Sequence, residues 1–149
     1  KRYIMKIKTF RNSMAPGGQD TIRLRTNNGL TGYRINKFQI ISAKPGTGTS
    51  TEFVVKLFTQ PPDSIDGEIN FADPLLLGVA YETDDTNPSN ASGLTIIFDH
   101  VKFNQDIYVS AVDNSGGTNG VNYYLELEQV KLSLDEATVA TLKDMRGRE

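Results

Sequence analysis

The stretch "NYYLELEQVKLSLDEATVATLKDMR", residues 122–146, contains the two periodicities that decide the fold. Its first half alternates apolar and polar residues, which is typical of a half-buried β-strand. Ser133 is then followed three residues later by Glu136, the spacing of a capping box at the start of a helix. Apolar residues at helical spacing follow, and Lys143 and Arg146 stand in the last turn, where the helix dipole favours positive charge. The stretch therefore predicts a strand followed by a short helix over residues 134–146.

The alternation within this strand changes phase near Glu128. Leu125 and Leu127 share one face, whereas Val130 and Leu132 fall on the opposite face. Because side chains alternate with a period of two, such a shift moves every later residue across the sheet unless a β-bulge or a new partner absorbs it. We interpret the shift as a strand that buries one apolar face in its own domain and turns the next toward another surface. In the alternative, the strand end and the helix fold back over the open end of their own domain.

A period of two also dominates the rest of the chain. Turn signals separate the strand candidates "TIRLRT" (21–26), "GYRINKFQIIS" (32–42), "STEFVVKLFTQ" (50–60), "GLTIIFDHVKF" (93–103) and "QDIYVSAVD" (105–113). The Gly-rich "NSGGTNG" (114–120) indicates a hairpin between its flanking strands, and the Pro-rich segment 61–93 predicts a long loop with a short helix or an edge strand over 75–81. Seven or eight strands predict an all-β fold, an antiparallel β-sandwich of jelly-roll-like type with a short C-terminal α-helix.

Length and composition narrow the classes of protein. A chain of 149 residues predicts a single domain over 1–149. Its 16 basic and 18 acidic residues give no basic patch of the kind that binds nucleic acid. No apolar run approaches the ~20 residues that cross a bilayer, so no membrane partner is expected. The absence of Cys excludes disulfides, thiolate metal sites and Cys nucleophiles.

The sequence contains no recognisable constellation of catalytic residues. His100, the single histidine, lies between apolar residues in "FDHVKF" and is interpreted as structural. The carboxylates Asp63, Asp66 and Glu68 could form a glycosidase pair, but such a pair needs a defined separation across a cleft, and a solvated loop is the favoured interpretation. Residues 84–87 offer oxygen ligands without the spacing of an EF-hand. We therefore expect no catalytic, cofactor-binding or metal-ligating residues, and a protein that is not an enzyme.

Both ends of the chain contain apolar residues that could contact another subunit. Residues 1–18 place apolar side chains in both alternating sets and end in "APGG", so they form either an ordinary first strand or an arm that adds to a neighbour's sheet edge. The predicted interface residues of the two ends are Tyr3, Ile4, Met5, Ile7, Phe10, Val130, Leu132, Val139, Leu142 and Met145.

The run "FNQDIYVSAVDNSGGTNGVNYYLELEQVKLSLDEATVATLKDMR" (103–146) resembles the ends of small virion structural proteins of tailed bacteriophages. The resemblance covers roughly the last third of the chain, and "GYRINKFQIIS" and "FVVKLFTQ" are compatible with it. Such families include capsid decoration or cement proteins, often jelly-roll trimers that bridge major capsid subunits, and small neck and tail components. The resemblance transfers no individual binding residues to this chain.

The resemblance implies a virion structural protein without catalytic activity, most specifically a decoration or cement protein that binds and stabilises the phage head lattice. Its expected partners are itself, as a homotrimer, and the major capsid protein. Its expected location is the virion, assembled in the bacterial host cytoplasm. The alternatives are a tail, neck or fibre-associated component, or a carbohydrate- or receptor-binding module that uses loops 61–93 and 114–120.

Overall fold

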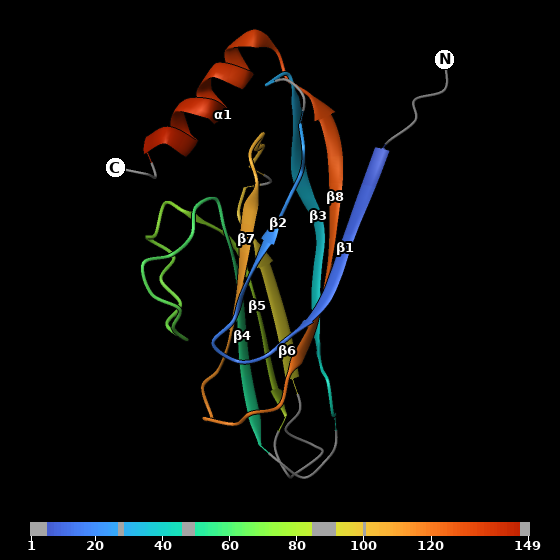
Figure 1. The fold of residues 1–149 in the computed structure, drawn as a ribbon, viewed down its shortest axis with the longest axis vertical. Coiled ribbons are helices and arrows are strands. Elements are labelled where there is room, and N and C mark those ends of the chain that lie inside the picture. The colour runs from blue at the N-terminus through green and yellow to red at the C-terminus, as the bar shows by residue number, and fades with distance from the viewer. Residues whose placement is uncertain (1–5, 27–28, 46–49, 85–91, 100, 147–149) are drawn as a thin grey trace.

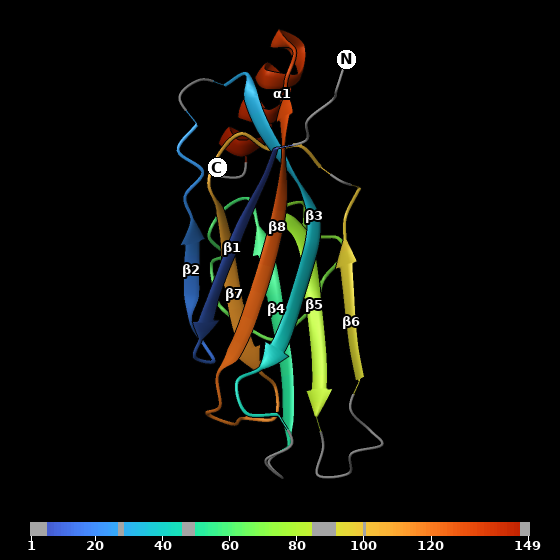
Figure 2. The same ribbon diagram turned by 90° about the vertical axis from the view of Figure 1, so that its right-hand side faces the viewer.

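The computed structural model describes residues 6–26, 29–45, 50–84, 92–99 and 101–146. These residues form two antiparallel β-sheets that pack face to face, with one helix at one end (Figures 1 and 2). In chain order the elements are β1 (Lys6–Met14), β2 (Gln19–Ile22), β3 (Thr31–Ser42), β4 (Thr51–Phe58), β5 (Leu76–Asp84), β6 (Ser92–Ile97), β7 (Ile107–Asp113), β8 (Val121–Lys131) and α1 (Leu134–Arg146). The architecture confirms the predicted all-β antiparallel sandwich with a short C-terminal helix.

The strand order is close to that of a jelly roll. One sheet has the order β1-β8-β3 and the other the order β2-β7-β4-β5-β6. The pairs β1 with β8, β2 with β7, and β4 with β5 nest inside one another along the chain, as they do in a jelly roll. A fourth nested pair would join β3 to β6, but β6 pairs with β5 instead. The fold is therefore jelly-roll-like, and β3 and β6 are both edge strands.

The core lies between the inner faces of the two sheets. Alternate residues of each central strand point inward, as the period of two requires. Phe53 and Leu57 of β4, Val109 of β7, and Leu125 and Leu127 of β8 have no solvent exposure. Burial on this scale gives the chain a hydrophobic core that needs no disulfide.

A polar contact also joins the two sheets. The hydroxyl of Tyr123 on β8 donates a hydrogen bond to Asp20 Oδ2 on β2 (3.0 Å), and Asn12 Nδ2 on β1 donates to the same oxygen (2.8 Å). Burial, followed by the negative charge of Asp20, raises the pKa of the Tyr123 hydroxyl well above its ordinary value. The hydroxyl therefore stays protonated and acts as a donor.

The phase change in β8 is not accompanied by a bulge in β8. This strand keeps an unbroken register with β1 from Gln129 to Val121. The irregularity lies in β3, where the pairing with β8 shifts between Ile35 and Lys37. At the phase change itself, Glu128 is 6% exposed and accepts a hydrogen bond from Arg34 Nε at 2.6 Å. The phase change is therefore accommodated without a bulge in β8, and the charged side chain of Glu128 is buried where the apolar set changes face.

Two further predictions about pairing are corrected by the sheets. Residues 114–120 do not close a hairpin, because β7 pairs with β2 and β4 whereas β8 pairs with β1 and β3. This segment instead crosses from one sheet to the other. Residues 76–84 form a strand, but β5 lies between β4 and β6 and is not an edge strand.

Candidate functional site

Helix α1 begins with the capping box that the sequence predicts. The backbone N–H of Glu136 donates to Ser133 Oγ (3.1 Å), and the backbone N–H of Ser133 donates to Glu136 Oε1 (3.3 Å). Asp135 and Glu136 place negative charge in the first turn, at the positive end of the helix dipole. These local contacts start the helix at Leu134, so only two residues separate it from the end of β8 at Lys131.

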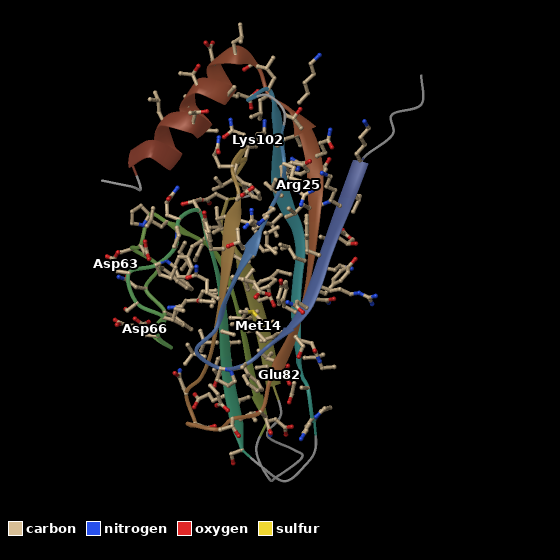
Figure 3. The ribbon with its side chains drawn as sticks, in the orientation of Figure 1. Met14, Arg25, Asp63, Asp66, Glu82 and Lys102 are labelled. Carbon is tan, nitrogen blue, oxygen red and sulfur yellow. The ribbon has the colours of Figure 1, made fainter. Side chains whose placement is uncertain are left out.

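The helix folds back over one end of the sandwich (Figure 1). Asn104, which is 1% exposed, donates a hydrogen bond through Nδ2 to Thr141 Oγ1 (3.2 Å). Lys102 Nζ lies 2.5 Å from Glu136 Oε2, and Figure 3 shows Lys102 beside the helix. Ala137 is only 8% exposed. The structure therefore has the fold-back arrangement, in which the inner side of α1 belongs to its own domain.

Leu132, between β8 and α1, is a core residue. Its side chain is 2% exposed, and its backbone N–H donates to the carbonyl of Leu30 (2.7 Å). A Cβ added at Gly32 would lie 2.9 Å from Leu132 Cγ, so the missing side chain of Gly32 leaves the space that Leu132 fills. The prediction that Leu132 contacts another subunit is therefore wrong.

The large apolar side chains of α1 that the structure describes are exposed to solvent. Leu134 is 75% exposed, Val139 is 51% exposed and Leu142 is 45% exposed. An amphipathic helix of a globular protein normally turns its large apolar residues toward the core, but α1 packs there through the small Ala137. We call Leu134, Val139 and Leu142 the outer helix face. Leu134 was absent from the predicted interface residues. Its position at the start of the helix, outside the main apolar stripe, was a usable signal that its side chain is exposed.

The other predicted interface residues are distributed between the surface, the core and the undescribed part of the chain. The described part of segment 1–18 includes β1, which pairs with β8 of its own sheet. Ile7 is 40% exposed, Phe10 is partly buried against the core, and Val130 is half-buried. Tyr3, Ile4 and Met5 lie outside the described residues, as does the side chain of Met145.

The 59–75 loop covers part of the outer face of the five-stranded sheet. Lys56 of β4 is 6% exposed beneath this loop, and its Nζ donates to Asp66 Oδ1 (3.1 Å) and to the carbonyl of Glu68 (2.7 Å). The hydrogen bond from Lys56 is the largest cause that lowers the pKa of Asp66 below its ordinary value. The buried lysine was not predicted, although a single charge within the apolar run "FVVKLF" was a usable signal.

The acidic residues of this loop line one cleft together with Lys56. Asp66 serves as the counter-ion of Lys56, and Figure 3 shows Asp63 and Asp66 on the outer side of the molecule. Within the described ranges, no group of three or more His, Cys, Asp or Glu side chains could hold a metal ion. His100, Asp85 and Asn87 lie outside the described residues.

Replacing Asp66 with asparagine is expected to destabilise the fold by about 1–2 kcal/mol at neutral pH. The Asp66 side chain is 50% exposed, so solvent screens its ion pair with the buried ammonium of Lys56 and its loss costs less than the loss of a fully buried counter-ion. Since the folded pKa of Asp66 is lowered, its contribution is complete above the unfolded pKa and is lost as the pH falls through the folded pKa. Urea unfolding should therefore show the two proteins converging in acid. The matched control Asp63→Asn, on the same loop, should change stability by less than about 0.5 kcal/mol.

Several clefts open on the described surface, and the one lined by the acidic residues of the 59–75 loop has a volume of about 450 Å³. A groove of about 900 Å³ lies at the edge strands β3 and β6 and is lined by Gln39, Ile41, Leu94, Asn122 and Tyr124 among others. Another cleft of about 490 Å³ lies between α1 and the ends of β5 and β7 and is mainly apolar.

Comparisons with known proteins found no family model and no curated protein that matches this chain. Among the described residues, no helix has the length and apolar character needed to cross a membrane.

Proposed function

We propose that this chain is a virion structural protein without catalytic activity, most specifically a decoration or cement protein that binds and stabilises a phage head lattice. The observation that carries the proposal is the solvent exposure of the outer helix face. Three large apolar side chains stay in water while the same helix docks through an alanine. An exposed apolar patch of this kind is typical of a surface that contacts another protein. The resemblance of residues 103–146 to phage structural proteins supports the same function.

A single contact through this face is small, so its effect depends on repetition. Burial of apolar surface contributes roughly 25 cal/mol per Å², and three side chains on one short helix supply only a modest area. Many copies on a regular lattice bind with a combined avidity far above that of one contact. A protein that binds only the assembled lattice also stabilises that lattice by mass action. A tail or neck component would use the same chemistry at another position in the particle.

The groove at β3 and β6 favours a second candidate, a carbohydrate-binding module. Tyr124 offers an aromatic ring, and Gln39 and Asn122 offer amide groups that both donate and accept hydrogen bonds. The Tyr124 hydroxyl contacts Glu126 Oε1 at 3.3 Å. We rank this candidate second, because the groove does not account for the exposed apolar residues of α1.

The double variant Val139→Gln, Leu142→Gln tests the proposed function. Both side chains are half-exposed, so the free energy of unfolding should change by less than about 0.5 kcal/mol. Binding to head particles assembled without this chain should fall at least tenfold in a co-sedimentation assay. Deleting the helix is a poorer test, because deletion also removes the buried contacts of Ala137 and Thr141.

The matched control is Ile41→Gln, Leu94→Gln, which makes the same chemical change at residues that are 58% and 62% exposed on β3 and β6. This control should bind particles as the wild type does. Equal binding by the helix variant, or absence of the chain from purified particles, would contradict the proposal. Specific binding to a glycan array, lost in the groove control and kept in the helix variant, would favour the carbohydrate-binding module.

A further inference from the structure

Two surfaces of the molecule carry opposite charge. Strand β1 contains three basic residues and no acidic residue along Lys6–Met14, with Lys6 and Lys8 on one face of this edge strand and Arg11 on the other. The 59–75 loop contains four acidic residues and no basic residue. The basic residues are Lys6, Lys8 and Arg11, and the acidic residues are Asp63, Asp66, Glu68 and Asp73.

These two surfaces cannot neutralise each other within one chain. β1 is an edge strand of the three-stranded sheet, whereas the loop lies outside the five-stranded sheet, on the opposite side of the molecule (Figures 1 and 3). The side chains of Lys6, Arg11, Asp63 and Glu68 form no hydrogen bond or ion pair with any residue that the structure describes. Two like-charged groups on each surface are therefore available to a partner.

Each surface also exposes apolar side chains beside its charges. Ile65, Ile69 and Phe71 of the loop are 36%, 40% and 57% exposed, and Ile7 of β1 is 40% exposed. Protein interfaces commonly combine an apolar centre with a polar rim. The loop and β1 therefore match in charge and in apolar character, although they lie too far apart to meet in one molecule.

We propose that a second copy of this chain occupies each surface, with β1 of one copy against the 59–75 loop of the next. Because the two surfaces differ, the contact is head-to-tail, and repetition of the contact produces a closed ring or an open chain. The sequence predicted self-association and placed Ile7 of β1 among the interface residues, but it did not indicate the 59–75 loop. The inference goes beyond the proposed function. The contact between copies does not depend on which particle the chain binds, and it does not involve the outer helix face.

Two charge-neutralised variants of the full chain test the contact. The strand variant carries Lys6→Gln and Arg11→Gln, and the loop variant carries Asp63→Asn and Glu68→Gln. The wild type should form species larger than the 16.5 kDa of one chain at low ionic strength in sedimentation velocity. These species should dissociate at about 1 M salt, where the screening length is about 3 Å. Each variant alone should remain a monomer.

An equimolar mixture of the two variants gives the decisive measurement. The strand variant keeps an intact loop and the loop variant keeps an intact β1, so only one productive contact exists between them. The mixture should form one-to-one dimers, twice the 16.5 kDa mass of one chain, and should not grow further. Self-association through any other surface would not limit the mixture to one-to-one dimers.

Matched controls remove the same number of charges elsewhere. Lys37→Gln with Lys131→Gln changes two exposed lysines on β3 and β8, and Asp99→Asn with Asp135→Asn changes two exposed carboxylates. Both controls should assemble as the wild type does. A monomeric wild type at low salt, a mixture that stays monomeric, or assembly that survives in the strand and loop variants would overturn the inference. Particle binding in the helix assay is measured separately, so failure of one proposal is distinguishable from failure of the other.

Discussion

Replacing Leu132 with alanine is expected to lower the free energy of unfolding by about 3 kcal/mol, within the range for large-to-small changes in a core. The side chain is 2% exposed and fills the space above Gly32, between the end of β8 and the start of α1. Its removal leaves a cavity where the helix joins the sandwich. Urea unfolding followed by circular dichroism measures the change, which should appear as a lower transition midpoint with an unchanged slope.

The control for this experiment is Val139→Ala on the adjacent helix. Val139 is 51% exposed, and alanine has the higher helix propensity, so stability should change by less than about 0.5 kcal/mol. A similar small change for Leu132→Ala would show that the strand end does not dock on its own domain in solution. The pair of variants thus separates the buried side of this segment from the side that we propose for binding.

Replacing Asp113 with alanine is expected to cost about 2–4 kcal/mol, because three partly buried hydrogen bonds lose their charged acceptor. Asp113 is 6% exposed at the end of β7. Its Oδ1 accepts hydrogen bonds from the backbone N–H of Glu52 (3.0 Å), the backbone N–H of Ser115 (2.9 Å) and Ser115 Oγ (2.5 Å). The residue therefore ties the start of β4 to the turn that follows β7. Thermal and urea unfolding would both report the loss.

The variant Asp113→Asn refines this prediction. Asparagine keeps one acceptor oxygen and nearly the same shape, so the donors of Glu52 and Ser115 remain satisfied. Its amide nitrogen is then buried near Gly117, where a Cβ would lie only 2.7 Å from Asp113 Oδ2. The loss should be smaller than that of the alanine variant. Equal losses in both variants would show that the negative charge, and not the acceptor geometry, stabilises the turn.

Much of the fold could be predicted because its signals are local in sequence. The alternation in residues 32–42 and 107–113 and the β-branched and aromatic residues of 51–58 predict strands, and each segment forms a strand. Ser133 and Glu136 form their capping box three residues apart, so the start of α1 needed no tertiary information. Residues 75–81 were ambiguous because a short apolar run fits either a strand or a helix segment.

The candidate surfaces could not be predicted to the same extent, because burial depends on partners that are distant in sequence. Asn104 and Thr141 hold α1 in place across 37 residues, and Lys56 meets Asp66 only because the 59–75 loop returns over β4. Val130 and Leu132 look equivalent in the alternating pattern, yet the absence of a side chain at Gly32 buries Leu132. Nothing in the pattern itself distinguishes them.

The sequence by itself determined that residues 32–42, 51–58, 107–113 and 121–131 form strands and where the C-terminal helix begins, since side-chain periodicity and capping are properties of adjacent residues. Only the tertiary structure decided that β7 and β8 belong to different sheets, that β6 joins β5, and that α1 docks through alanine and leaves Leu134, Val139 and Leu142 in water. The reason is that a period of two assigns a residue to one of two faces, whereas the neighbour of a strand or helix is set by packing among elements far apart in the chain.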